Sequence, residues 1–155
     1  MIRNISELYK KYKPVKEYFE ICIHPDEEKL LAVDKEKVSE GFFPKRGYQL
    51  KLSVARRRSA INDFKKLGAS EESVADLLLH FVESAIKYAD CVVEVSESLY
   101  TSIGNTYSNA LDLMSKNKVL AKFSRRAHNI VEETEYFGYG LYDYMRDLYE
   151  QYYES

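Results

Sequence analysis

Helical periodicity along almost the whole chain constrains the fold more than any other feature. Apolar residues recur three and four positions apart, as they do on one side of an α-helix, and strict strand-like alternation is not found. Only six glycines and three prolines interrupt the 155 residues. The pattern predicts an all-α protein of about seven helices, packed as α-hairpins in an irregular bundle or a short solenoid-like array. The lack of a fixed sequence period disfavours the solenoid.

Capping signals predict where these helices begin and end. Asn4, with Glu7 three residues later, resembles a capping box, and Pro14 suits the first turn of a second helix. Gly68 is expected to end a helix as a left-handed cap, and Ser70 to begin the central, largely apolar helix. The later helices are expected at residues 26–41, 53–67, 70–91 and 99–114. Another is expected after Asn117, lined by residues from Leu120 to Val131, and the tail forms the last.

Length and composition indicate a single domain spanning residues 1–155. A chain this long buries roughly 70% of its unfolded surface, and contents of 45% hydrophobic and 31% charged residues are ordinary for a globular protein. The start, MIRNISELYKKYK, is too polar for a signal peptide, and no apolar run approaches the roughly 18 residues of a membrane span. Cys22 and Cys91 are expected to be buried free thiols. A cytoplasmic location without membrane contact follows as the expectation.

Charge is distributed unevenly along the chain. The formal net charge of -2 argues against a protein dominated by nucleic-acid or acidic-membrane binding. The segment between Pro44 and Gly68, however, contains eight basic residues and only one acidic residue, Asp63. Guanidinium and ammonium groups in such a cluster can hold phosphate or an acidic partner, whereas the ordinary alternative is a solvated basic face. The candidate anion- or partner-binding residues are Lys45, Arg46, Lys51, Arg56, Arg57 and Arg58.

Arg57 stands out within this cluster. The helical period places it on the apolar face beside Ile61 and Phe64. A charge in that position requires a partner, because leaving it buried and unpaired costs several kcal/mol. The possible partners are a carboxylate of the same chain, backbone carbonyls and an anionic ligand. The carboxylate is the ordinary partner, and the anionic ligand is the functional alternative.

The amino-terminal half resembles a known family. The segments that carry the resemblance lie over roughly residues 7–95, and the most specific are KPVKEYF at 13–19 and FKKLG at 64–68. They are similar to small bacterial proteins catalogued only as a domain of unknown function. The resemblance implies an all-helical bacterial protein and supplies neither an activity nor site residues.

Several chemical functions find little support in the sequence. The segment FKKLGASEESVADLL has the spacing of a helix-turn-helix, but Glu71, Glu72 and Asp76 would face the phosphates of DNA, so a capped α-hairpin is the ordinary interpretation. The acids after His24 and the Asp76–His80 pair lack the spacing of a metal site. No nucleophile motif or phosphate loop is present, so we expect no catalytic residue, metal or cofactor.

The tail holds seven of the 14 tyrosines, counted from Tyr136. On a helix, its inward face is expected to comprise Leu141, Met145, Leu148, Tyr149 and Tyr152. The edge residues Tyr142, Tyr144 and Tyr153 form a candidate aromatic interface rim, while Tyr136 and Tyr139 are expected at the turn into the helix. We therefore expect a non-catalytic protein-interaction or assembly module, with a hetero-partner or a second copy as the partner. The alternative is a nucleic-acid or phosphate-binding module that uses Lys45 to Lys66.

Overall fold

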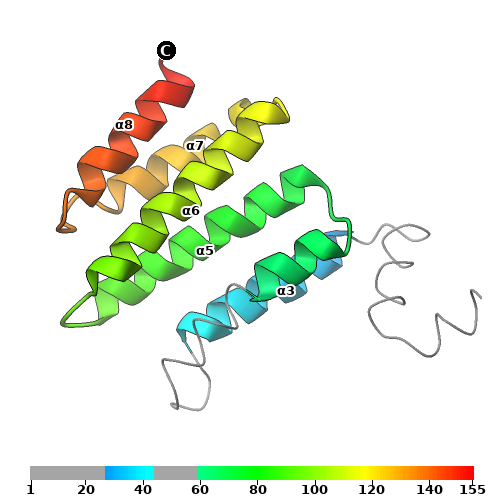
Figure 1. Ribbon diagram of the computed structural model, residues 1–155, viewed down its shortest axis with the longest axis horizontal. Helices are drawn as coiled ribbons and strands as arrows, with labels where there is room; N and C mark the ends of the chain where they lie inside the picture. Colours follow the sequence, from blue (N-terminus) through cyan, green and yellow to red (C-terminus); the bar gives the residue numbers. More distant parts are fainter. Residues whose placement is uncertain (1–26, 44–58) are drawn as a thin grey trace, which may run out of the picture.

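The computed structural model describes residues 27–43 and 59–155, and within these ranges the protein is helical without a strand (Figure 1). This confirms the predicted all-α class. The helices predicted from Asn4 and from Pro14 lie outside the described residues. The helices are α3 (Glu27–Phe42), α5 (Glu71–Cys91), α6 (Glu97–Lys116), α7 (Leu120–Glu132) and α8 (Leu141–Tyr153), and residues 59–66 are also helical.

Local capping explains the observed helix boundaries. Gly68 adopts a left-handed conformation (φ 77°) after the segment 59–66, as predicted. The Ser70 hydroxyl then accepts a hydrogen bond from the Ser73 N–H at 3.3 Å, which caps α5. Ser96 caps α6 in the same way, with the Leu99 N–H as donor at 3.3 Å.

The central helix is α5, as the sequence predicted. In Figure 1 it lies between α3 on one side and α6 on the other, and α8 packs on the far side of α6. The shorter α7 contacts α8 most extensively and also touches α5 and α6. Consecutive helices from α5 to α8 alternate in direction, which is the predicted packing as α-hairpins.

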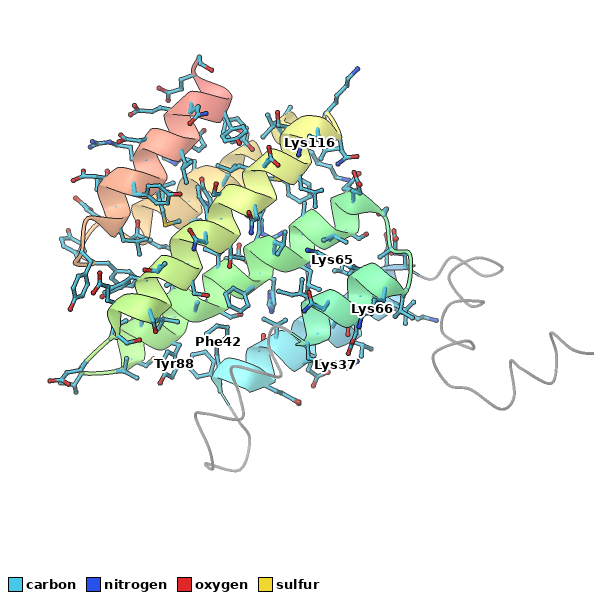
Figure 2. The ribbon with its side chains drawn as sticks, in the orientation of Figure 1. Lys37, Phe42, Lys65, Lys66, Tyr88 and Lys116 are labelled. Carbon is cyan, nitrogen blue, oxygen red and sulfur yellow. The ribbon has the colours of Figure 1, made fainter. Side chains whose placement is uncertain are left out.

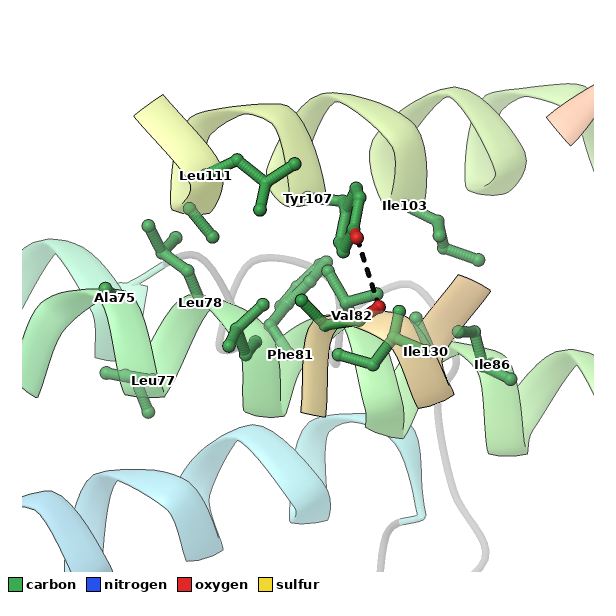
Figure 3. Close-up of a cluster of buried hydrophobic side chains, with 14 of the residues drawn as sticks. Ala75, Leu77, Leu78, Phe81, Val82, Ile86, Ile103, Tyr107, Leu111 and Ile130 are labelled. Carbon is green, nitrogen blue, oxygen red and sulfur yellow. Dashed lines mark hydrogen bonds between the residues drawn. The ribbon is translucent and has the colours of Figure 1, made fainter. Parts of the chain in front are cut away.

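Side chains from all of these helices share one hydrophobic core. The buried face of α5 meets Ile103, Tyr107 and Leu111 of α6 and Ile130 of α7 (Figure 3). The hydroxyl of the fully buried Tyr107 donates a hydrogen bond to the Ala127 carbonyl of α7 at 3.1 Å. The core therefore positions α6 and α7 relative to each other through a specific polar contact as well as apolar packing.

Contacts at both ends of α3 hold it against α5. At one end, the Glu27 carboxylate accepts hydrogen bonds from the Ser70 backbone N–H and from the hydroxyls of Ser70 (2.9 Å) and Ser73 (3.0 Å). At the other end, the Phe42 ring packs on Phe81 and Tyr88, with centroid distances of 5.2 and 6.0 Å (Figure 2).

The tail forms α8 and docks on the core by the predicted face. Leu141 and Met145 are buried, while Leu148, Tyr149 and Tyr152 are partly buried against the core. Tyr136 and Tyr139 lie in the turn before α8, as expected. No described helix combines the length and the apolarity that crossing a membrane requires.

The expectation of buried thiols is wrong for Cys91, which is exposed. Ala89 is the last buried residue of α5, and Cys91 is the final residue of that helix, beyond the end of the core. Cys22 lies outside the described residues.

Candidate functional site

The basic site predicted from the sequence lies mostly outside the described residues. All six candidate residues, Lys45, Arg46, Lys51, Arg56, Arg57 and Arg58, belong to residues 44–58. Two further lysines of the basic segment, Lys65 and Lys66, are described and are exposed on the segment 59–66 (Figure 2). Anion binding by this segment, and the partner of Arg57, therefore stay predictions.

The helix that would read DNA in a helix-turn-helix is enclosed by other helices. This helix is α5, which packs against α3, α6 and α7. Glu72, in its first turn, forms an ion pair with Lys122 of α7. A helix covered in this way cannot enter a major groove. The structure supports the capped α-hairpin instead.

Three polar residues of α5 face neighbouring helices. We call Asp76, His80 and Glu83 of α5 the inner polar face. The Arg126 guanidinium of α7 donates to both oxygens of Glu83, at 2.8 and 2.9 Å, and to the Asp76 carboxylate. Lys35 of α3 reaches the same Asp76 oxygen at 2.7 Å. The acids of this face are therefore paired within the protein.

The ionisation of this network follows from its burial and its pairing. Burial alone would raise the pKa of Asp76, but the hydrogen bonds from Lys35 and Arg126 outweigh it and hold the pKa below the usual value. Burial likewise opposes the charge on Arg126, and the bonds to Glu83 and Asp76 outweigh it, so its pKa is raised. The network is held in its charged form.

His80 does not form a nucleophile–base pair with the neighbouring serines. Its Nε2 lies 2.8 Å from the Ser39 hydroxyl and 3.0 Å from the Lys35 carbonyl. The carbonyl can only accept a hydrogen bond, so Nε2 carries the hydrogen in that contact and is not a base toward Ser39. Burial lowers the pKa of His80, against the attraction of Glu83. This arrangement fits a structural role.

Metal-ligating clusters are likewise not seen within residues 27–43 and 59–155, where no group of three or more candidate ligands is found. Asp76 and His80, which lie one turn apart, are occupied by Lys35, Arg126 and Ser39 instead. Glu27 is used by the cap of α5. His24 and Asp26 lie outside the described residues.

The three rim tyrosines occupy different environments. Tyr142 is half-buried, with the Arg146 guanidinium 5.5 Å from its ring centroid. Tyr153 stacks on Tyr149 and donates its hydroxyl to the Leu120 carbonyl at 2.9 Å, and burial raises its pKa to about 12. Tyr144 alone among the three is classed as exposed, at 45%. Tyr142 and Tyr153 of the rim therefore make contacts within the protein, and Tyr144 is the rim tyrosine that is exposed to solvent.

Tyr144 borders a pocket of about 330 Å³ between the start of α6 and the turn before α8. We call this the aromatic pocket, because three tyrosine rings line it. Tyr100 and Tyr139 pack against each other with centroids 5.6 Å apart, and the Tyr100 ring also contacts Phe137 at 5.5 Å. The pocket is lined by Glu97, Tyr100, Thr101, Gly104, Asn105, Tyr139, Gly140, Leu141 and Tyr144.

Tyr139 occupies an unfavourable backbone conformation. Its φ is 58°, in the left-handed region, which costs a residue other than glycine roughly 1–2 kcal/mol. Glycine or asparagine is the usual solution at such a position. The contact with Tyr100 offsets part of the cost, yet Tyr139 remains 70% exposed. Strained, exposed residues of this kind are frequent at functional sites.

Gly104 allows Tyr144 to lie against α6. A Cβ atom at Gly104 would be 3.0 Å from Cε1 and 3.1 Å from Cδ1 of the Tyr144 ring. Glycine within a helix costs about 1 kcal/mol relative to alanine. Here the missing side chain makes room for the ring that forms one wall of the pocket.

Further hollows continue from the aromatic pocket along α6. One of about 460 Å³ shares Glu97, Thr101 and Asn105 with it, and another of about 330 Å³ shares Asn105. A fourth, of about 350 Å³, reaches Asp112 and Leu113. We call this run of neighbouring hollows the α6 groove. The uncharged polar residues that line the three further hollows are Ser98, Thr101, Ser102, Asn105, Thr106, Asn109 and Asn62, and the charged ones are Glu97, Lys65, Glu71 and Asp112.

The end of the bundle that holds the aromatic pocket is acidic. The α5–α6 and α7–α8 connections meet there, and residues 90–97 and 132–143 contain neither lysine nor arginine. We call this region the acidic end. Burial raises the pKa of Glu133, and the charges of Glu83 and Asp90 add to this effect against the opposing charge of Lys87. The acidic residues of this end are Asp90, Glu94, Glu97, Glu132, Glu133, Glu135 and Asp143.

The sequence pointed to Tyr144 as a candidate interface residue. It did not show that Glu97, Tyr100 and Tyr139 lie with Tyr144 in one pocket. The pocket is built from the first turn of α6 and the turn before α8, which lies about forty residues later in the sequence. The helical periodicity of the sequence does not show that these two segments are in contact. The available signal was the GYG at 138–140, where a tyrosine lies between two glycines in a turn.

The fold and site define an all-helical protein with an acidic, aromatic surface pocket. The chain belongs to a family of unknown function, DUF6155, whose sequence model matches residues 2–152. The match extends beyond residues 7–95, on which the resemblance rested, and includes α6, α7 and most of α8. No curated protein and no solved structure shows a significant similarity to the chain.

Proposed function

We propose that the protein is a non-catalytic protein-interaction or assembly module that binds a segment of a partner protein in the α6 groove. The observation that carries the proposal is Tyr139, a large aromatic residue held in a left-handed conformation with most of its surface exposed. Folding gains little from a residue placed in this way. Exposed tyrosines that bury their rings on binding are typical anchors of protein interfaces.

The shape of the α6 groove fits an extended polypeptide. Its lining runs from Glu97 to Leu113, which corresponds to roughly 24 Å along a helix. An extended chain covers that length with about seven residues. The hydroxyl and amide groups along the groove can both donate and accept hydrogen bonds, so they suit the backbone of such a segment.

Affinity purification from the native host with three chains tests the proposal. The wild type is compared with Tyr139→Asn, in which asparagine tolerates the left-handed backbone, and with Tyr136→Asn as the matched control. Tyr136 is 91% exposed in the same turn and does not line the pocket. We expect Tyr139→Asn to recover the partner about tenfold less efficiently, as for an interface anchor, and the control to match the wild type. Equal recovery by all three chains would contradict the proposal.

The alternative function, binding of nucleic acid or phosphate by Lys45 to Lys66, has its support in the sequence, because the described part of this segment adds only the exposed Lys65 and Lys66. Retention on heparin that falls steeply with salt and is lost in an Arg56→Glu/Arg58→Glu variant would favour it. The same protein would then keep its retention after Tyr139→Asn, so the two functions are separable.

A further inference from the structure

We propose that the aromatic pocket binds an arginine side chain of the partner protein, an inference that rests on the proposed function and specifies what the partner must carry. Tyr100, Tyr139, Tyr144 and Glu97 all line this pocket and together form the site. Aromatic faces carry negative electrostatic potential and attract cations, and a carboxylate adds a full charge.

The charges around the pocket favour a cation. Glu97 is the only side chain with a formal charge in its lining, and Glu97 makes no ion pair with any residue of the described chain. The N-terminal ends of α6 and α8 lie here, and each contributes about half a positive charge. Glu97, in the first turn of α6, contributes a full negative charge, whereas Asp143 of α8 is paired with Arg146 at 3.4 Å. The uncompensated acidic side chain beside the tyrosine rings is therefore Glu97.

The size of the pocket fits one side chain. Its volume of about 330 Å³ is at the lower end of the roughly 300–1,000 Å³ found for ligand pockets, too small for a large cofactor. Arginine suits it better than lysine, because a planar guanidinium stacks on tyrosine and binds a carboxylate with two parallel hydrogen bonds. Thr101 and Asn105 line the same pocket, and their hydroxyl and amide oxygens are acceptors for the remaining donors of the guanidinium.

Titration of the full chain with blocked amino acids, followed by ¹⁵N NMR, tests the assignment. The probes are N-acetyl-arginine methylamide, its lysine counterpart, and the uncharged norleucine counterpart. We expect the arginine compound to shift the amide signals of Thr101, Gly104 and Gly140 saturably at millimolar concentration, the lysine compound to bind more weakly, and norleucine to leave these signals unchanged. Norleucine or lysine binding as tightly as arginine would overturn the proposal.

Two variants and a control locate the binding. Glu97→Gln should weaken arginine binding about threefold through the lost carboxylate charge, and Tyr139→Asn about threefold through the lost ring. Glu132→Gln removes an exposed charge of the acidic end that does not line the pocket, and it should leave the affinity unchanged. An equal loss in Glu132→Gln and Glu97→Gln would mean that a general acidic field attracts the probe, which would overturn the site.

The outcomes separate this inference from the proposed function. If partner recovery depends on Tyr139 and the arginine probe does not bind, the interaction function stands and the arginine assignment fails. If arginine binds as described and partner recovery is unaffected by Tyr139→Asn, the cation site stands and the proposed function fails.

Discussion

The inner polar face of α5 and the aromatic pocket beside α6 both present polar groups on helices of the core, and they differ in where their partners come from. Asp76 and Glu83 are paired with Lys35 and Arg126, which the neighbouring helices supply. At the aromatic pocket, Glu97 has no such counter-charge in the described chain, and Tyr139 is 70% exposed.

This difference separates a polar surface that serves folding from one that is available for binding. A closed network specifies how α3, α5 and α7 fit together, and disturbing it should affect stability. An open pocket contributes little to stability, and disturbing it should affect binding. The two surfaces therefore make opposite predictions for the same kind of substitution.

The largest loss of folding stability is expected from replacing Arg126. Arg126→Met keeps a long side chain but leaves Glu83 without its bidentate partner and removes one of the two cations at Asp76. Breaking a buried pair by removing one partner costs 3–5 kcal/mol, and the 27% exposure of the Arg126 side chain places the expected loss at about 3 kcal/mol. Urea denaturation measures the free energy of unfolding.

The neighbouring Arg125 supplies the control for Arg126. It is exposed on the same helix, so Arg125→Met should change the free energy of unfolding by less than about 0.5 kcal/mol. Losses of similar size in the two variants would show that the inner polar face does not carry the stability assigned to it.

A smaller loss of folding stability is expected from replacing the buried Tyr107, and no loss from replacing the exposed Tyr136. Tyr107→Phe removes the hydrogen bond from the buried hydroxyl to the Ala127 carbonyl, at a cost of about 1 kcal/mol. Tyr136→Phe removes a hydroxyl from a residue that is 91% exposed and should have no measurable effect. A melting temperature of Tyr107→Phe equal to that of the wild type would contradict the role given to this bond.

The sequence predicted the helices well because their signals are local. Gly68 and Ser70 terminate and cap neighbouring helices through contacts within a few residues, and the apolar face of α8 can be read from its period alone. Cys91 was misplaced because an apolar sequence context does not show that the helix outruns the core by two residues.

The sites depended on contacts that no local pattern encodes. In the sequence, His80 stood out only as one half of the Asp76–His80 pair. In the structure its ring is hydrogen-bonded to the Lys35 carbonyl and the Ser39 hydroxyl, about forty residues earlier. The aromatic pocket similarly joins Tyr100 to Tyr139. In both cases residue types were visible in the sequence, while their partners were fixed only by the packing of distant helices.

Within residues 27–43 and 59–155, two residues other than glycine adopt a left-handed conformation, and they provide a sharper test of the comparison. Lys118 (φ 58°) ends α6, and Tyr139 (φ 58°) lines the pocket. Lys118→Gly should raise the free energy of unfolding by about 1 kcal/mol, because glycine relieves the strain and little packing is lost. Tyr139→Gly gains the same relief but loses the ring contact with Tyr100, worth about 0.5–1.5 kcal/mol, so its stability should stay close to that of the wild type.

The two variants should also differ in how they bind the arginine probe. Lys118→Gly should bind the arginine probe as the wild type does, and Tyr139→Gly should bind it about threefold more weakly. A Tyr139→Gly variant that lost several kcal/mol of stability would show that this tyrosine is retained for folding, and the aromatic pocket would then resemble the inner polar face.

The smallest expected effect is on how the free energy of unfolding changes with pH, through His80 of the inner polar face. His80 is held neutral by burial, and the charged groups around it are Lys35 of α3, Glu83 of α5 and Arg126 of α7. Its pKa in the folded protein lies below the value of about 6.5 for an unfolded histidine, so the unfolded chain takes up a proton first as the pH falls. The free energy of unfolding should therefore decrease below about pH 6.5, until the pH reaches the folded pKa.

His80→Gln isolates that contribution, because glutamine can still donate to the Lys35 carbonyl and carries no titratable group. Its free energy of unfolding, measured in urea from pH 7 to 5, should decrease less than that of the wild type. His128→Gln is the matched control, since His128 is exposed on α7 with its ring edge against Tyr149, and it should keep the wild-type pH dependence. If His80→Gln kept that dependence too, His80 would not be a buried neutral group, and the inner polar face would be more open to solvent than its contacts imply.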